Sequence, residues 1–239
     1  MPIQAIEPRR LYRQIADQLR ALIAAGEFPL GSRLPPERDL ATQLGVSRPS
    51  VREALIALEV EGLVEVRMGS GIYVTAQEPA TQLRGVDSAL GPFDIMRARQ
   101  LIESELAAVA ARRKSSVTVK RMRVAVKLME DDIARGVMPM RGDRDFHLAL
   151  AEASDNAALV RVVTELFDER NNPLFEQLGR HFENARSWRQ AVVEHRVVLR
   201  AVAAGDVAGA RAAMRCHLGN SHDRFAVAWV EVTPAKEAA

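Results

Sequence analysis

The chain of 239 residues is long enough for about two domains, since one domain usually contains roughly 100–200 residues. Its 33 basic residues nearly balance its 31 acidic residues, and the two types are equally frequent in residues 1–77, which excludes a globally basic surface as the source of nucleic-acid affinity. The single cysteine excludes an intrachain disulfide, and because we find neither a signal peptide nor a membrane-length apolar run, we expect a cytoplasmic protein without a membrane partner.

Apolar residues at helical spacing between residues 11 and 23 predict a first helix that ends at Gly26. Residues 34–59 then predict two short helices that meet at a tight turn beside Gly45, a residue suited to a left-handed helix end. Ser47 can cap the second helix by accepting hydrogen bonds from its free amide groups. This pattern is typical of a helix-turn-helix, whose second helix enters the major groove of DNA.

Arg48 and Arg52 lie four residues apart near the start of this second helix. We therefore expect both side chains to project together from one face, where they could reach DNA. Arginine suits this role because its planar guanidinium can bind guanine O6 and N7 or clamp a phosphate. On an arbitrary helix, two such arginines would simply form a solvated surface, so the assignment depends on the elements that come after this helix in the chain.

Two β-rich runs, residues 62–67 and 72–75, come after the helix-turn-helix and are joined by the glycine-rich turn 68–71. They predict a β-hairpin, and a hairpin in this place is a wing. Gly69 and Gly71 carry no Cβ, so the tip of the wing could approach a sugar-phosphate backbone closely. The wing favours DNA binding over a solvated surface for the preceding helix.

The second half of the chain shows helical periodicity and no β signals, after a turn-rich linker predicted at residues 78–92. Helices are expected from Phe93 and around Met122, and then over 143–154, 156–171, 173–182, 184–204 and 206–230. The predicted fold is mainly α: a winged helix-turn-helix domain of three helices and a hairpin over residues 1–77, and an antiparallel bundle of six or seven helices over 93–232. The tail 233–239 has no apolar face and should be frayed.

Three histidines, His147, His195 and His217, lie beside apolar residues at helical spacing and are expected to face the bundle interior. Asp143 lies one turn before His147 and can converge with it, whereas Asp145 faces elsewhere. Taken singly, each histidine fits a hydrogen-bonded core residue better than a ligand. Together, one carboxylate and three imidazoles are costly to bury unless a divalent cation satisfies all four, so we expect a metal site. Zinc is the first choice, and nickel or manganese would also fit.

Several motifs resemble known families. LPPERDLA (34–41), GVSRPSVREAL (45–55) and GSG (69–71) resemble the winged helix of the GntR family. RQLIE (99–103), DRDFH (143–147), Asn156, EH (194–195) and CHL (216–218) resemble the FadR-type effector domain called FCD. Together the two resemblances cover nearly the whole chain, the first with very specific motifs and the second with shorter, scattered ones.

The resemblance implies a set of residues in contact with operator DNA: Arg38, Ser47, Arg48, Ser50, Arg52 and Gly69. Arg38 has an alternative role as a surface ion pair with Glu37 or Asp39, and helix capping alone would explain Ser47. In the second domain, the spacing of Asp143 and the three histidines resembles the metal-binding subset of FCD domains.

The resemblance also implies that the second domain binds a small effector. Arg99 could bind a carboxylate effector, or instead form an ion pair with Glu103, four residues on. Asn156 could line the effector pocket or cap a helix.

The function implied by these features is a ligand-responsive transcription regulator. A homodimer would bind a pseudo-palindromic DNA operator, and a small organic acid in the bundle would relieve repression. A metal-sensing regulator is an alternative. A DNA-tethered metalloenzyme is a weaker one, because Glu103, Glu152 and Glu194 are explained as helix-surface charges and no paired general base is evident. No catalytic residue is predicted.

Overall fold

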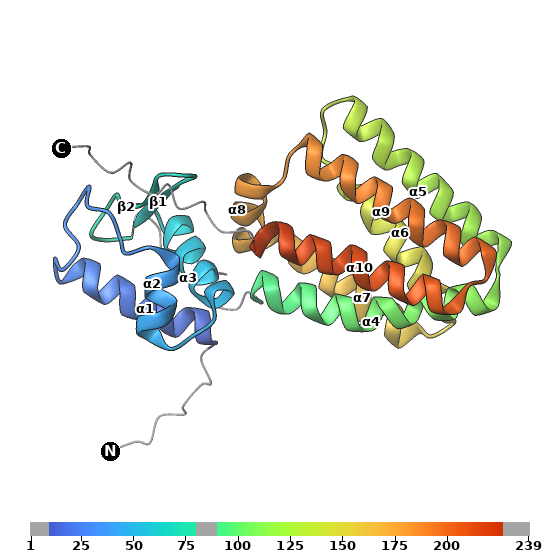
Figure 1. The fold of residues 1–239 in the computed structure, drawn as a ribbon, viewed down its shortest axis with the longest axis horizontal. Coiled ribbons are helices and arrows are strands. Elements are labelled where there is room, and N and C mark those ends of the chain that lie inside the picture. The colour runs from blue at the N-terminus through green and yellow to red at the C-terminus, as the bar shows by residue number, and fades with distance from the viewer. Residues whose placement is uncertain (1–9, 80–89, 227–239) are drawn as a thin grey trace, which may run out of the picture. The chain divides into compact units, whose positions relative to one another are not determined.

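The structure is a computed structural model that describes residues 10–79 and 90–226 (Figure 1). These residues form two compact units that divide between Gly91 and Pro92, and each unit is described by itself. Most of the predicted linker 78–92, the predicted end of the last helix at residue 230 and the predicted tail 233–239 lie outside the described residues. Within the described ranges, no helix is both long and apolar enough to cross a membrane.

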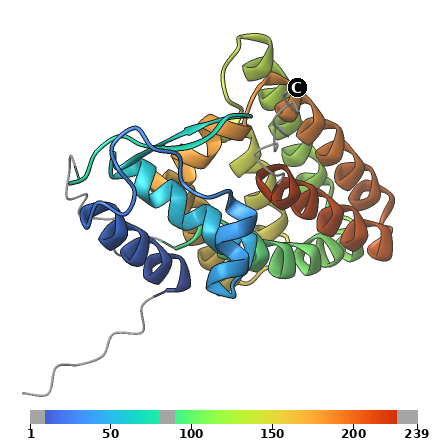
Figure 2. The same ribbon diagram turned by 60° about the vertical axis from the view of Figure 1, so that its left-hand side comes forward.

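The N-terminal unit is the predicted winged helix-turn-helix. Its elements are α1 (Leu11–Ala24), α2 (Glu37–Leu44), α3 (Arg48–Val60), β1 (Val64–Arg67) and β2 (Gly71–Val74). Helix α1 packs against α3, as the two views in Figures 1 and 2 agree. The strands pair antiparallel with Val64 opposite Val74 and form the predicted wing.

The turn between α2 and α3 forms for the predicted reasons. Gly45 ends α2 with a φ of 65°, in the left-handed region that favours glycine. Ser47 caps α3 by accepting a hydrogen bond from the backbone N–H of Ser50. Leu40 of α2 and Leu55 of α3 are buried, so the two helices share one core while the start of α3 remains exposed.

The C-terminal unit is a bundle of α-helices, seven in the described part of the chain, and this agrees with the prediction. The helices are α4 (Pro92–Arg113), α5 (Ser116–Ala134), α6 (Met140–Glu152), α7 (Ala157–Asp168), α8 (Pro173–Phe182), α9 (Ala185–Ala204) and α10 (Val207–Ala226). A short 3₁₀ turn, η1 (Glu169–Asn171), joins α7 to α8 where the sequence predicted that the helix would continue to residue 171. Helix α10 packs along α4 and α9, and α5 packs along α6 and α9.

The core of the bundle is lined by methionine, alanine and branched aliphatic side chains, among them Met122, Met129, Leu150, Val198 and Met214. Phe146 of α6 is fully buried, and its ring lies edge-on to the ring of His195 with the centroids 4.6 Å apart. The apolar core of the bundle therefore lies in direct contact with the buried histidines. The histidines of α6, α9 and α10 therefore face the middle of the bundle and not solvent.

Candidate functional site

Four side chains from three helices of the bundle converge on one point. They are Asp143 and His147 of α6, His195 of α9 and His217 of α10, and one candidate ligand atom from each lies within 4.8 Å of all the others. His195 Nε2 is 3.1 Å from Asp143 Oδ1 and 3.2 Å from His147 Nε2. The three imidazoles are at most 4% exposed. The structure thus brings together all four residues that the sequence singled out.

Each histidine uses its Nδ1 atom to donate to an acceptor at the edge of the cluster. His147 Nδ1 donates to the Glu103 carboxylate, His195 Nδ1 donates to the Ala191 carbonyl at 2.7 Å, and His217 Nδ1 donates to Glu194 at 2.8 Å. This pattern places a proton on Nδ1 of each ring and leaves Nε2 for the interior of the cluster, where a neutral ring can offer a lone pair to a metal ion. It is the arrangement in which ligating histidines are held in metal sites.

The donor set fits a divalent cation. Three nitrogens and one carboxylate oxygen suit zinc, and ligand atoms ~2.0–2.1 Å from a tetrahedral ion lie about 3.3 Å from one another. The distances from His195 Nε2 to the Asp143 and His147 atoms lie close to this value, and His147 Nε2 lies 3.6 Å from Asp143 Oδ1. Three of the four candidate ligands are therefore already near the spacing of metal ligands, and nickel or manganese is chemically compatible as well.

The protonation states also suit metal ligation. Burial raises the pKa of Asp143, but hydrogen bonds from two of the histidines and the charge of Arg170 outweigh it and hold this pKa well below its ordinary value. Burial, and then the charge of His195, lower the pKa of His217 to about 3. At neutral pH, Asp143 is therefore a carboxylate and His217 a neutral imidazole, as ligation requires.

Glu103 belongs to this site, and its interpretation as a helix-surface charge is wrong. Its side chain is 1% exposed, because α4 turns it inward against Arg99 Nε at 2.7 Å and His147 Nδ1. Burial raises the pKa of Glu103, but the charges of Arg99 and then His147 outweigh it and lower the pKa to about 2. Burial in turn lowers the pKa of His147, and the charge of Glu103 more than reverses this. Glu103 is thus a permanent anion behind the histidine.

The interpretation of Glu194 as a helix-surface charge is also wrong. Its carboxylate accepts hydrogen bonds from His217 Nδ1, from Asn220 Nδ2 at 2.9 Å and from Arg224 Nη1 at 3.0 Å. Burial raises its pKa, but the hydrogen bond from His217, the charge of Arg224 and the hydrogen bond from Asn220 are among the interactions that outweigh burial and lower it. Glu152, by contrast, pairs with Arg121 at the surface, as expected.

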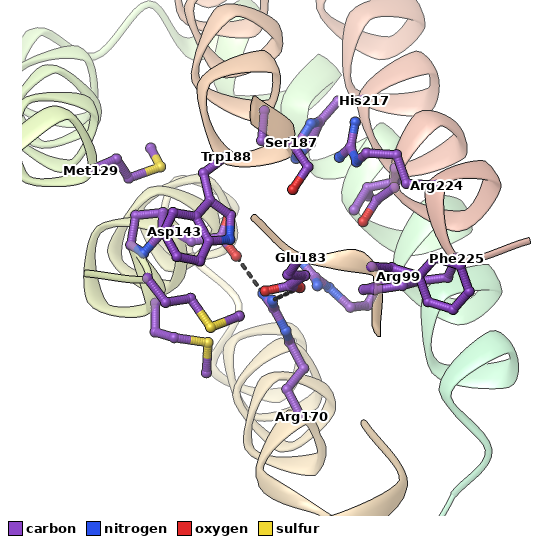
Figure 3. A pocket seen from close by; sticks show the side chains of 17 residues that line it. Arg99, Met129, Asp143, Arg170, Glu183, Ser187, Trp188, His217, Arg224 and Phe225 are labelled. Carbon is purple, nitrogen blue, oxygen red and sulfur yellow. Dashed lines mark hydrogen bonds and ion pairs between the residues drawn. The ribbon is translucent and has the colours of Figure 1, made fainter. Parts of the chain in front are cut away.

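Arg170 of η1 holds the second oxygen of Asp143, and the sequence did not indicate it. Its Nη1 lies 2.5 Å from Asp143 Oδ2, and its Nη2 lies 3.6 Å from Glu183 Oε1 (Figure 3). Because Oδ1 faces the histidines and Oδ2 faces Arg170, the carboxylate presents a single oxygen to the metal point. Burial raises the pKa of Glu183 despite the opposing charge of Arg170. Arg170 lies far from Asp143 in the sequence and on a 3₁₀ turn, so no periodic pattern in the sequence could predict the contact between them.

A cavity of about 650 Å³, including its open mouth, borders the metal point (Figure 3). Asp143 and His217 form part of its wall. Three guanidinium groups line it, those of Arg99, Arg170 and Arg224, and its apolar lining consists of Met129, Met138, Met140, Phe182, Trp188, Leu218 and Phe225 among others.

The two predicted effector residues have different outcomes. Arg99 forms the alternative ion pair with Glu103, and it also lines the cavity, with its guanidinium stacked 3.9 Å above the centroid of the Phe167 ring. The expectation that Asn156 lines the pocket is wrong. Its side chain is exposed and caps α7, accepting hydrogen bonds from the backbone N–H groups of Ala158 and Leu159. Asn156 acts as a helix cap and not as a pocket residue because it lies directly before the first residue of α7.

In the N-terminal unit, Arg48 and Arg52 do not project together as expected. The Arg48 side chain is 46% exposed at the start of α3, whereas that of Arg52 is 1% exposed. Arg52 donates to both oxygens of Glu37, which is itself 6% exposed, and Arg48 Nε reaches the same carboxylate at 3.1 Å. The prediction of a surface position for Arg52 is therefore wrong, because α2 covers that face of α3 with a carboxylate. Arg52 holds the two helices together in this structure.

The other predicted DNA contacts lie on the exposed side of the unit. The side chain of Arg38 is 63% exposed and pairs with Asp39 at 3.3 Å, the alternative foreseen for it. Ser47 caps α3, and its hydroxyl lies 2.8 Å from that of Ser50. Gly69 occupies the turn of the wing with a φ of 75°, which favours glycine there.

Comparisons with known proteins agree with these observations. Residues 11–74 match the family described as "Bacterial regulatory proteins, gntR family", and residues 94–220 match the FCD domain. The chain is 37% identical over 228 residues to the Uxu operon transcriptional regulator of Escherichia coli K12, covering 92% of this chain and 89% of that protein. It is 38% identical over 228 residues to the Exu regulon transcriptional regulator of the same strain, covering 92% and 86%.

Among solved structures, the chain is similar in fold to Lar, which controls the expression of the Listeria monocytogenes agr system. The TM-score is 0.52 and the identity 18%, over 92% of this chain and 99% of that chain.

Proposed function

Because the chain belongs to the GntR family of bacterial regulatory proteins and carries an FCD domain, it is a DNA-binding transcription regulator and not an enzyme, and we propose that its activity responds to a ligand. In this proposal the bundle holds a divalent metal ion and a small organic acid. The regulator is a homodimer that binds a pseudo-palindromic operator, and the acid relieves repression.

The observation that carries the metal proposal is the shared orientation of the three histidines. All three donate from Nδ1 and leave Nε2 for the point that Asp143 Oδ1 also faces. Each ring is held from its Nδ1 side, as ligating histidines usually are, so a metal ion could replace the contacts that the Nε2 atoms of His147 and His195 make with Asp143. Asp143, His147, His195 and His217 would hold the ion, which would act as a Lewis acid for an incoming oxygen ligand.

The cavity next to the metal point supports a carboxylate effector. Four protein ligands leave one or two positions on a five- or six-coordinate ion. Arg99 and Arg224 line the cavity and could bind the acid with their guanidinium groups, while the methionines and aromatic rings would bury its carbon skeleton.

The acid can change DNA binding only by its differential affinity for two arrangements of the protein. A coupling of about 1–3 kcal/mol is typical and would change operator affinity by roughly 5–150-fold. Relief of repression is the proposed direction.

Two measurements test the proposal. Metal analysis of protein purified without a chelator or a histidine tag should find close to one ion per chain, and His195→Ala should lose it. Binding to a duplex selected by the protein from a random library should then be titrated with metal alone and with metal plus candidate acids. A response to metal alone would favour the metal-sensing alternative, a response only to metal plus acid supports the proposal, and protein that takes up neither zinc, nickel nor manganese would refute the metal site.

A further inference from the structure

A hollow in the N-terminal unit, here called the wing notch, lies between the wing, residues 33–38 and the start of α3. Its volume, including its open mouth, is about 470 Å³. Its side chains include three arginines, Arg33, Arg38 and Arg48, and a single acid, Glu37. The Glu37 carboxylate is already engaged by Arg48 and by the buried Arg52. The notch therefore carries an excess of positive charge beside the residues that the sequence predicts to contact DNA.

Arg33 is the one arginine of this notch that the sequence analysis did not predict to contact DNA. Its side chain is exposed and has no ion pair among the described residues, unlike that of Arg38, which pairs with Asp39, or that of Arg48, which pairs with Glu37. An exposed cation without a counterion is available to an anionic partner at no cost of breaking an existing pair.

The backbone on either side holds Arg33 against the wing. Arg33 forms a β-bridge with Tyr73, Leu34 N–H donates to the Ile72 carbonyl at 2.8 Å, and Val74 N–H donates to the Ser32 carbonyl at 2.9 Å. Residues 32–34 thus lie antiparallel to β2 and are hydrogen-bonded to it. The Arg33 backbone is ordered before any partner arrives, which lowers the entropy lost on binding.

Gly71 leaves the space in which the guanidinium lies. A Cβ added at Gly71 would be 2.9 Å from Arg33 Cζ and 3.1 Å from its Nη2, so any side chain there would displace the Arg33 guanidinium. Gly71 also has a φ of 131°, which favours glycine. The sequence predicted that this glycine lets DNA approach, and the structure gives it a second role, since its bare Cα accommodates an arginine.

We propose that Arg33 binds a DNA backbone phosphate that enters the wing notch between the wing and the recognition helix α3. Arg38 and Arg48 border the same notch, so one phosphate there would be surrounded by guanidinium groups. A phosphate contact fixes the protein on the duplex but does not read its sequence. Arg33 therefore contributes affinity on every DNA sequence, while base discrimination belongs to α3.

The test compares three variants by fluorescence anisotropy on two duplexes, one selected by the wild-type chain from a random library and one scrambled. Arg33→Met removes the charge but keeps much of the side-chain volume, Arg33→Lys keeps the charge, and Arg123→Gln removes an exposed positive charge from α5 of the other unit. The slope of log K against log salt should fall in magnitude by about 0.9 per bound protomer in Arg33→Met.

The affinity of Arg33→Met relative to the wild type should therefore depend on salt. The ratio of wild-type to variant affinity should be about 3.5-fold smaller per protomer at 200 mM than at 50 mM salt, on both duplexes. Arg33→Lys and Arg123→Gln should keep the wild-type slope. An unchanged slope in Arg33→Met would overturn the proposal, and so would an equal loss of slope in Arg33→Lys, since either result would make Arg33 a support for the wing. Melting temperatures verify that all variants are folded.

Discussion

The replacement of Glu103 by glutamine tests whether the buried carboxylate behind His147 supports a metal site. Glu103 has a pKa of about 2 and is 1% exposed, so this substitution removes a real charge from the interior at neutral pH. Glutamine has nearly the same shape and can still accept one hydrogen bond from His147 Nδ1 or from Arg99. What it loses is the charge that orients the imidazole and makes its Nε2 a stronger donor to a metal.

The expected result is a 10–100-fold loss of metal affinity, which is typical when such a supporting partner is changed. This corresponds to about 1.4–2.7 kcal/mol. Arg99 also loses its buried counterion, so the metal-free protein should be less stable as well. For this reason affinity should be measured directly, by competition with a chromogenic zinc chelator, and not inferred from melting temperature.

Glu105→Gln is the matched control. Glu105 lies two residues further along α4, is exposed and pairs with Arg211 at the surface, so the control removes the same charge from the same helix. Its zinc affinity should equal that of the wild type. If Glu103→Gln binds zinc as tightly as Glu105→Gln does, the reasoning that connects the histidine tautomers to a metal site is refuted.

Two further predictions concern the N-terminal unit. Arg48→Ala should abolish discrimination between the selected and scrambled duplexes while the unit stays folded, because the side chain is 46% exposed at the start of α3; unaltered footprints would remove α3 as the recognition helix. Glu37→Gln should destabilise the unit by up to about 3–5 kcal/mol, the cost of leaving a buried cation such as Arg52 without its partner, as measured by thermal or urea unfolding monitored by circular dichroism. Glu65→Gln, which removes an exposed carboxylate of the wing, is its control, and equal stability of the two variants would contradict a structural role for the Glu37–Arg52 pair.

The sequence predicted the features that depend on local spacing. Asp143 and His147 lie one helical turn apart, so their convergence results from helix geometry alone. The turn at Gly45 and the cap at Ser47 are also local, and both form as predicted.

The features that the sequence did not predict depend on how separate elements pack. Whether Arg52 faces solvent is decided by Glu37 on another helix, and whether Glu103 is buried is decided by the register of α4 against α6. Arg170 reaches Asp143 across 27 positions of sequence from a 3₁₀ turn. Such contacts between elements leave no periodic signal in one sequence.

The double use of the Glu37 carboxylate has a consequence for anyone who redesigns the operator preference of this regulator. The same carboxylate pairs with the half-exposed Arg48, the proposed DNA contact, and with the buried Arg52, which joins α2 to α3. If Arg48 contacts the operator as proposed, exchanging residue 48 alone would change the contact with DNA and leave the Glu37–Arg52 pair intact, whereas any change at residue 37 would disturb both. Libraries for new target sites should therefore vary position 48 and its exposed neighbours, and keep the carboxylate beneath them fixed.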